Sequence, residues 1–355
     1  MKNILITGGA GFVGASLAIE LKAKYPDLHV ICLDNLKRKG SELNLPRLAK
    51  AGAVFQHGDI RNREDFDGLP PIDILIEASA EPSVLAGLNG TTPDYLINTN
   101  LVGTINCLNF AVKNKSAFVF LSTSRVYPIK TIENLNFVEK ETRFALADEQ
   151  PVAGASAKGI AEDFPLNAAR SLYGTTKLAS ELLIQEYHEF YGLKTVVNRC
   201  GVLTGPWQMG KIDQGVMVLW AAKHHWNQQL AYIGYGGHGK QTRDMLHVKD
   251  LFRLVDWQLQ NIDTVNGLTL NAGGGVEVSA SLQELTALCQ KHTGNVIPIN
   301  KVTENRPADI RLFVTDNTEV TKLTGWKPEI CMDQIVKEIC DWLKENDAIL
   351  KPILG

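Results

Sequence analysis

The chain has 355 residues, of which 45% are hydrophobic and 21% are charged, and its formal net charge is −3 at pH 7. This length and composition are typical of a globular protein with one large domain, or with a large domain and a smaller one. Because the charge is close to zero and no basic stripe runs along the sequence, nucleic acid is not expected as a partner.

The cysteines and the apolar runs indicate the compartment. The six cysteines include no C-x-x-C pair, so we predict no disulfide framework and no metal site. The longest apolar stretch, residues 216–222, is too short to cross a bilayer. No signal-peptide pattern precedes the first strand-like run. We therefore expect a cytoplasmic protein that has no membrane partner.

Short apolar runs alternate with longer helical patterns in the first part of the chain. Strands are predicted at residues 4–6, 29–33, 54–55, 74–76, 118–121 and 195–197, and helices at residues 14–24, 94–113 and 173–191. Strands that alternate with helices are typical of right-handed βαβ units. We therefore predict an α/β fold with a Rossmann-like, doubly wound parallel sheet.

The pattern changes after residue 203, where glycine, proline and aromatic residues become frequent. Two further segments, residues 247–260 and 281–293, have helical spacing. We predict that residues 1–202 and about 236–270 form the large sheet domain, and that about 203–235 and 271–355 form a smaller, mixed α/β C-terminal domain. Residues 134–167 are predicted to form a long loop near the active site.

A glycine-rich run follows the first predicted strand and opens the first predicted helix. Residues 7–14 read TGGAGFVG, in which Gly8, Gly11 and Gly14 have the spacing G-x-x-G-x-x-G. Glycines permit the close approach of a pyrophosphate, and free N–H groups at the helix start stabilise its charge. Asp34 ends the second strand, 20 residues after Gly14, where an acid can bind ribose hydroxyls. We predict a dinucleotide site in the large domain rather than a turn without a ligand.

The acid at the second strand favours NAD over NADP, because the carboxylate of Asp34 repels a 2′-phosphate. Arg38 and Lys39 follow shortly after it and could instead bind such a phosphate. After the third strand, Asp59 and Ile60 have two interpretations: contact with the adenine, or an N-cap at Asp59 for a following helix.

Two groups of residues predict oxidoreduction chemistry. Tyr173 and Lys177 are four residues apart on one predicted helix, so both side chains project from the same face. A neighbouring ammonium lowers the pKa of a tyrosine, whose ordinary value of about 10 is too high for a base at neutral pH. Residues 122–124 (STS) close the fifth strand at the carboxyl edge, where α/β sheets bind ligands. Thr123 can there hydrogen-bond the reacting oxygen alongside Tyr173.

These residues resemble the nucleotide-sugar epimerases and dehydratases of the extended short-chain dehydrogenase/reductase family. The resemblance includes residues 100–104 (NLVGT), 121–127 (LSTSRVY), the Tyr173/Lys177 pair and residues 243–250 (RDMLHVKD). It implies that Thr123, Tyr173 and Lys177 are the catalytic set, that NAD is the cofactor, and that the protein is a homodimer or homotetramer. The cofactor-binding residues predicted from the resemblance and the motifs together are Gly8, Ala10, Gly11, Phe12, Val13, Gly14, Asp34, Asn35, Arg38, Asp59, Ile60, Ala78, Ser79, Ala80, Asn100, Ser122, Tyr173, Lys177, Cys200 and Val202.

Four loops are similar to those of the 2-epimerases that act on CDP-linked sugars, namely residues 34–40, 57–62, 213–215 and 239–244. This similarity implies inversion at C2 through transient oxidation to a keto sugar. A 4-epimerase, a net reductase and a catalytically idle NAD-binding protein stay open as alternatives. Two segments depart from the family pattern and leave the sugar and the carbon open, namely residues 77–81 (EASAE) and 200–204 (CGVLT).

One further departure bears on the reaction type. Sugar 4,6-dehydratases of the family carry an Asp-Glu pair directly after the catalytic threonine, and this pair supplies the acid and the base for elimination of water. The corresponding residues here are Ser124 and Arg125, which cannot supply them. The sequence therefore disfavours a dehydratase.

The nucleotide end of the substrate needs cations for its diphosphate, and an arginine can bind two oxygens at once. Arg243 and Arg306 match the diphosphate-binding arginines of the family, although an isolated arginine is more often part of a solvated ion pair. Asp309 could accept a hydrogen bond from a nucleotide ribose. The predicted substrate contacts are Glu81, Thr123, Ser124, Arg125, Gln208, Gln214, Arg243, Arg306 and Asp309.

Overall fold

The computed structural model describes residues 2–88, 92–210 and 215–355. The chain divides into two compact units. The first contains Met1–Val126, Leu172–Arg199 and Leu251–Leu270, and the second contains Tyr127–Ser171, Cys200–Asp250 and Asn271–Gly355. Within the described residues, no helix combines the length and the apolar character that a membrane span needs.

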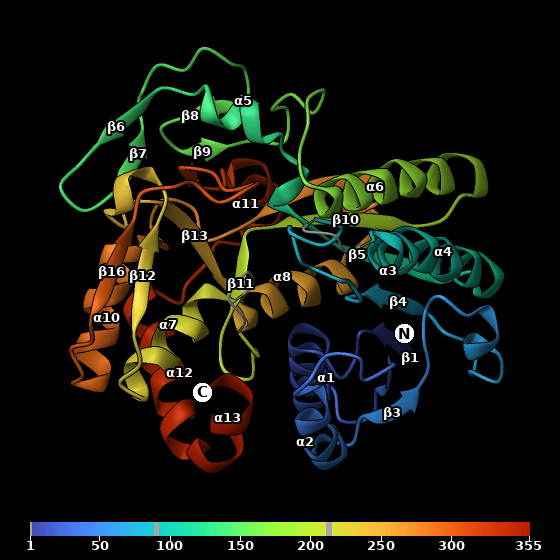
Figure 1. The fold of residues 1–355 in the computed structure, drawn as a ribbon. Helices are drawn as coiled ribbons and strands as arrows, with labels where there is room; N and C mark the ends of the chain where they lie inside the picture. The colour runs from blue at the N-terminus through green and yellow to red at the C-terminus, as the bar shows by residue number, and fades with distance from the viewer. Residues whose placement is uncertain (1, 89–91, 211–214) are drawn as a thin grey trace. The chain divides into compact units, whose positions relative to one another are not determined.

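A seven-stranded sheet forms the centre of the first unit (Figure 1). Its strand order is β14 (Leu268–Ala272), β10 (Thr195–Cys200), β5 (Ala117–Thr123), β4 (Ile74–Glu77), β1 (Asn3–Thr7), β2 (His29–Asp34) and β3 (Val54–His57). The pairs β1/β2, β2/β3, β1/β4 and β4/β5 are parallel. Because the chain proceeds from β1 to β2 on one side and returns to β4 on the other, a ligand crevice is expected at the carboxyl ends of β1 and β4. The predicted Rossmann-like α/β fold is confirmed.

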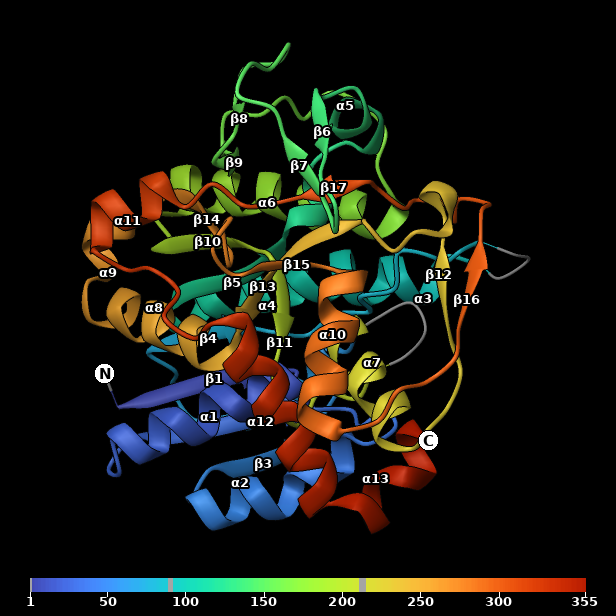
Figure 2. The same ribbon diagram turned by 90° about the vertical axis from the view of Figure 1, so that its left-hand side faces the viewer.

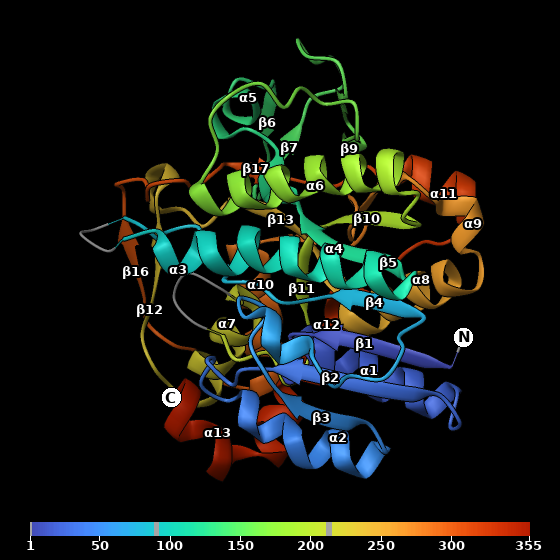
Figure 3. The ribbon, with the colours of Figure 1, turned by 90° about the vertical axis from the view of Figure 1, so that its right-hand side faces the viewer.

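Helices cover both faces of this sheet. The helices α4 (Gly103–Asn114) and α6 (Leu172–Tyr191) lie side by side over one face, and α1 (Phe12–Lys24) and α8 (Val248–Gln260) lie over the other (Figures 1 and 3). On the α4/α6 face, Leu5, Leu75 and Phe118 of the strands pack with Leu108 and Ile184 of the helices. Burying each such side chain contributes about 1.5–3 kcal/mol, so this layer holds the strand ends in place. The unit also contains α2 (Leu45–Ala51) and α9 (Ile262–Val265).

The helix predicted at residues 94–113 is interrupted. It consists of α3 (Asp94–Ile97), a π-helical turn at Asn98–Val102 and α4. The hydrophobic spacing of the segment is close to that of an uninterrupted helix, so a turn of this kind is not visible in the periodicity. Such turns occur frequently at functional sites, because they reposition one side chain without ending the helix. Asn100 lies within this turn and is buried.

Among the described residues, the second unit contains four small sheets and a group of helices. The largest sheet joins β11 (Val202–Thr204), β13 (Thr242–His247), β15 (Ser279–Ser281) and β17 (Leu312–Phe313), and a second one pairs β12 (Leu230–Ile233) with β16 (Ile299–Val302). The helices α7 (Val216–His225), α10 (Leu282–Thr293) and α12 (Met332–Glu345) pack together (Figure 2). The remaining helices of this C-terminal part are α11 (Thr318–Thr324) and α13 (Asp347–Leu354).

The prediction of a long loop at residues 134–167 is wrong. The segment begins after α5 (Ile129–Glu133) and contains two antiparallel pairs, β6 (Phe137–Glu139) with β7 (Phe144–Leu146), and β8 (Ala155–Ser156) with β9 (Gly159–Ile160). Phe144 packs against Leu312 and Val314, so partners distant in the sequence stabilise the first pair. Strands of two or three residues are too short to show a periodicity of their own.

The division into units differs from the predicted one in three segments, of which residues 200–202 are the shortest. Tyr127–Ser171 and residues 236–250 belong to the second unit, although the sequence placed both with the large sheet. Residues 236–250 belong to the second unit because they contain β13, which pairs with β11, β15 and β17.

Candidate active site

The glycine-rich run forms the turn between β1 and α1. Gly8 has φ +66°, a left-handed conformation that glycine adopts without strain. A Cβ atom on Gly14 would lie 2.2 Å from the carbonyl oxygen of Gly8, which is backbone and cannot move aside cheaply. The spacing of the motif therefore reflects a close packing of the turn on the start of the helix.

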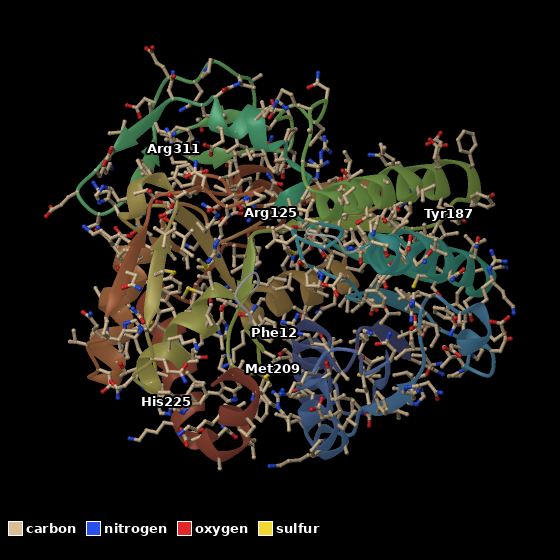
Figure 4. The ribbon with its side chains drawn as sticks, viewed as in Figure 1. Phe12, Arg125, Tyr187, Met209, His225 and Arg311 are labelled. Carbon is tan, nitrogen blue, oxygen red and sulfur yellow. The ribbon has the colours of Figure 1, made fainter. Side chains whose placement is uncertain are left out.

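The N-terminus of α1 suits an anion. Gly11 occupies the N-cap position without a side-chain hydrogen bond, and the first turn contains no acidic residue. Phe12 marks the start of this helix in Figure 4. Unsatisfied N–H groups and the helix dipole stabilise a phosphate at such a position. The turn and the helix start therefore fit the pyrophosphate of a dinucleotide.

Asp34 lies beside this turn, at the end of β2. Its Oδ2 accepts a hydrogen bond from the backbone N–H of Ala10 at 3.1 Å, and its Oδ1 accepts one from Leu36 at 2.7 Å. Burial raises the pKa of Asp34, and these backbone hydrogen bonds oppose that effect. The carboxylate is thus held in a defined orientation next to the glycine turn, as a ribose ligand requires.

The N-cap interpretation of Asp59 is wrong. The short 3₁₀-helix that follows spans Arg63–Phe66, and its N-cap is Asn62. The carboxylate of Asp59 instead forms an ion pair of 2.6 Å with Arg61 and accepts a hydrogen bond of 2.8 Å from Asn35. Burial disfavours the charged form of Asp59, but the hydrogen bonds from Arg61 and Asn35 prevail and lower its pKa to about 2. The ion pair and the Asn35 hydrogen bond fix the loop that was predicted to approach the adenine.

Tyr173 and Lys177 lie in the first two turns of α6, and both are nearly inaccessible to solvent. Tyr173 is 9% exposed and Lys177 is 2% exposed. The Nζ atom of Lys177 lies 3.7 Å from the centre of the Phe120 ring on β5, a cation–π contact with the strand that carries Thr123. The ammonium is therefore held against the sheet, away from bulk water.

Thr123 is the last residue of β5 and is half-buried. Its Oγ1 accepts a hydrogen bond of 3.1 Å from the backbone N–H of Arg125. The turn at Ser124–Val126 packs against α6, and Arg125 lies beside the beginning of that helix (Figure 4). Thr123, Tyr173 and Lys177 therefore all belong to the first unit, on β5 and on the helix that packs against it.

Two predicted cofactor residues use their side chains inside the protein. The amide of Asn100 accepts from the backbone N–H of Glu81 at 2.8 Å, donates to the carbonyl of Glu81 at 3.0 Å, and donates to Thr176 at 3.3 Å. The hydroxyl of Ser122 donates to Glu181, which is in turn paired with Arg199. Both side chains hold α6 and the strand ends in place, so their contribution to the site is through position.

Glu77 is a buried acid at this sheet edge, and the sequence singled it out only as part of the departing segment 77–81. It ends β4, it is fully buried, and its Oε1 lies 2.6 Å from the hydroxyl of Thr104. Burial raises the pKa of Glu77 to about 7, while Lys177 and Thr104 act in the opposite direction. The sequence did contain a signal for this residue, because an acid that directly follows the apolar run 74–76 is expected at the end of a buried strand. Its partner on α4 lies 27 residues further on and could not be identified without the fold.

The predicted residues at the nucleotide end lie in the second unit. Arg243 forms an ion pair of 2.8 Å with Asp309, and Arg306 is exposed in the same segment, three residues before Asp309. Gln208 donates to the carbonyl of Leu203 at 2.8 Å. Cys200 is buried, Val202 is half-buried, and Gln214 lies outside the described residues.

The described part of the chain contains no group of three or more His, Cys, Asp or Glu side chains that could hold a metal ion.

Residues 4–273 match the NAD dependent epimerase/dehydratase family. The chain belongs to this family. It is 31% identical over 355 residues to the CDP-paratose 2-epimerase of Salmonella typhi, and the match covers 96% of this chain and 98% of the relative. As in this family, its cofactor is NAD.

Solved structures give the same fold. The structure of Pal from Bacillus thuringiensis is 26% identical, has a TM-score of 0.78, and the match covers 97% of this chain and 99% of that one. A dTDP-glucose 4,6-dehydratase from Bacillus anthracis, solved in complex with NAD, has a TM-score of 0.78 at 23% identity, with 99% and 100% covered. At that identity the likeness concerns the fold alone.

Proposed function

We propose that this protein is an NAD-dependent nucleotide-sugar epimerase that inverts C2 of a CDP-linked sugar of the paratose or tyvelose type. The observation that carries the proposal is the position of Lys177, which is buried against β5 one helical turn after Tyr173 and beside the strand that ends in Thr123. The similarity over almost the whole chain to a CDP-paratose 2-epimerase supports the choice of nucleotide and carbon. The predicted alternatives, a 4-epimerase, a reductase and an idle NAD-binding protein, are outcomes of the tests below.

In this proposal Tyr173 is the base. A tyrosine ordinarily titrates near pH 10, so its phenol is too weak a base at neutral pH unless a positive charge stabilises the phenolate. Lys177 supplies that charge from the same helix face, and its burial strengthens the interaction by excluding water. Tyr173 then removes the proton from the sugar C2 hydroxyl and returns it once the configuration has changed.

The remaining parts divide between holding NAD and holding the sugar. When bound, NAD would supply the hydride acceptor and donor that oxidation and re-reduction of C2 need. The glycine turn and the start of α1 bind its pyrophosphate, and Asp34 binds its adenosine ribose. Thr123 donates a hydrogen bond to the reacting oxygen, and the Glu81 and Ser124 side chains are proposed to border the sugar.

A dehydratase activity is disfavoured by the residues that follow Thr123. Elimination of water needs an acid and a base at the sugar. Ser124 offers only a neutral hydroxyl, and the guanidinium of Arg125 does not lose its proton in a protein. Oxidation followed by re-reduction needs neither group, because Tyr173 and NAD suffice.

At the nucleotide end we propose that Arg243 and Arg306 bind the diphosphate and that Asp309 binds the nucleotide ribose. Arg243 already contacts Asp309 at 2.8 Å, so a diphosphate would share this arginine with the carboxylate. Gln208 and Gln214 are proposed as further polar contacts, and the protein is proposed to act in the cytoplasm as a dimer or tetramer.

The test is a panel of CDP-, UDP-, GDP- and dTDP-linked sugars with three proteins: wild type, Tyr173→Phe and Tyr191→Phe. Tyr191 ends the same helix and is 64% exposed, so its variant controls for loss of a phenol from α6. We expect Tyr173→Phe to lose at least about 10²-fold in turnover while it retains NAD, and Tyr191→Phe to match wild type. Equal activity of the wild type and the Tyr173→Phe variant would refute the proposal.

The fate of hydrogen distinguishes the mechanisms. During epimerisation in heavy water, C2 should keep its own hydrogen, because the hydride never exchanges with solvent. Deuterium at C2 would indicate deprotonation of carbon instead. Stoichiometric consumption of added NADH would identify a reductase, and inversion at C4 would identify a 4-epimerase.

A further inference from the structure

Glu77 lies on the middle strand of the seven-stranded sheet. It is the last residue of β4, and it is in register with Thr7 of β1 and Phe120 of β5. Its side chain lies on the same face of the sheet as Leu75, toward α4 and α6, and is 0% exposed. The ammonium of Lys177 lies over the ring of Phe120. Glu77 and Lys177 are thus separated from water by the same layer of side chains.

The hydrogen bonds around Glu77 contain one acceptor more than they have protons to donate. The Thr104 hydroxyl lies 2.6 Å from Glu77 Oε1 and 2.9 Å from the carbonyl oxygen of Asn100, but it has a single proton to donate. If Glu77 is protonated, it can donate to Thr104, which then donates to Asn100. If Glu77 is ionised, Thr104 must turn to the carboxylate and release the carbonyl. Within the described residues, Oε2 has no hydrogen-bond partner at all.

The charges around Glu77 come from two helices. From α6 the positive charge of Lys177 attracts the carboxylate. On α4 the thiol of Cys107 is fully buried, and burial raises its pKa; the charge of Glu77 raises this pKa further, whereas Lys177 lowers it. The neighbours in register on β1 and β5 are Thr7 and Phe120, which carry no charge. Burial raises the pKa of Glu77 to about 7, against the effects of Lys177 and Thr104. Near neutral pH the carboxyl group is therefore poised between its two forms.

We propose that Glu77 is a positioning residue whose protonation state sets how strongly Lys177 favours the phenolate of Tyr173. This inference rests on the proposed function of the Tyr173/Lys177 pair. An ionised Glu77 partly neutralises the ammonium and draws it toward the sheet, so the phenolate is stabilised less. A neutral Glu77 leaves the full positive charge available to Tyr173. Protonation of Glu77 as pH falls thus offsets part of the loss of phenolate, so turnover depends less steeply on pH.

The first test compares the pH dependence of turnover in wild type, Glu77→Gln and Glu162→Gln. Glutamine retains the shape of the side chain and its contact with Thr104, but it is neutral at every pH. Glu162 is a half-buried acid of the second unit that burial also disfavours in its charged form, so its variant controls for loss of a partly desolvated carboxylate. We expect Glu77→Gln to match wild type near pH 6. Above pH 7 the variant should be more active than wild type and should reach a given turnover at a pH about one unit lower. Its KM should stay unchanged. Superimposable profiles for wild type and Glu77→Gln would overturn the inference.

The second test needs no substrate. In protein labelled with ¹³C at glutamate carboxyl groups, the resonance missing from Glu77→Gln identifies Glu77. We expect it to titrate near neutral pH in wild type and at higher pH in Lys177→Met, because the attracting charge is lost. If no sugar in the panel is turned over but this titration and its shift are observed, the proposed function fails and the coupling stands. A resonance that does not respond to Lys177→Met overturns the coupling itself.

Discussion

Replacing Arg199 tests how the strand ends at the site are held. The guanidinium lies 2.8 Å from Glu181 Oε2, and the side chains of Arg199 and Glu181 are only 8% and 2% exposed. The hydroxyl of Ser122, the neighbour of Thr123, donates to the same carboxylate. The pair thus connects β10, α6 and β5. Arg199→Met removes the cation and keeps most of the volume, which leaves a buried carboxylate with Ser122 as its remaining donor in this group.

The expected cost follows from the burial of the pair. Two unit charges about 4 Å apart attract by roughly 4 kcal/mol at an effective dielectric constant of about 20. Removing one partner of a buried pair typically costs about 3–5 kcal/mol, because the other charge stays desolvated. We therefore expect Arg199→Met to lower the free energy of unfolding by about 3–5 kcal/mol. The double variant Glu181→Leu/Arg199→Met should cost clearly less than the sum of the two single variants.

The assay is equilibrium urea unfolding of NAD-free protein, with the slope of each transition checked for a common two-state behaviour. Lys194→Met is the matched control, because Lys194 pairs with Asp263 on the surface, where the side chains are 50% and 79% exposed. This control should cost under about 1 kcal/mol. A cost below about 1 kcal/mol for Arg199→Met, or strictly additive effects in the double variant, would show that burial of the pair has been misjudged.

Three further predictions concern the glycine turn, Glu77 and a helix cap. A Cβ on Gly14 would lie 2.2 Å from the Gly8 carbonyl oxygen, so Gly14→Ala should destabilise the protein by about 1–3 kcal/mol and yield protein without bound NAD, measured by absorbance of the released nucleotide. Full NAD occupancy in this variant would contradict the role of the turn. The pKa of Glu77 rises from its ordinary 4.5 to about 7 on folding, so the native state keeps a proton that the unfolded chain has lost. Stability should therefore fall by up to about 3 kcal/mol as pH rises from 4.5 to 7, and Glu77→Gln should abolish this part of the dependence in urea titrations at several pH values. Ser281 caps α10 by accepting from Glu284 N–H at 3.1 Å, so Ser281→Ala should cost about 1 kcal/mol in the same assay, and an unchanged midpoint would argue against the cap.

Much of the first unit could be predicted because its signals are local. Apolar runs such as residues 74–76 form buried strands, and the Tyr173/Lys177 spacing places two side chains on one helix face. The glycine spacing of the turn is also local, since Gly8 and Gly14 contact each other within a single turn. In each of these cases the residues that determine the structure are within a few positions of one another.

The tertiary structure decided what depends on distant partners. Phe144 joins the second unit through Leu312 and Val314, which no short window of sequence could indicate. Glu77 is buried, and its pKa is raised, because β4 lies between β1 and β5 in the middle of the sheet. The helices α4 and α6 bring Thr104 and Lys177 to the same face. The sequence by itself determined which residues can carry charge and where strands and helices form. Burial, which sets the strength of those charges, arises from strand register and helix packing across the whole sheet, so it was settled only in the folded chain.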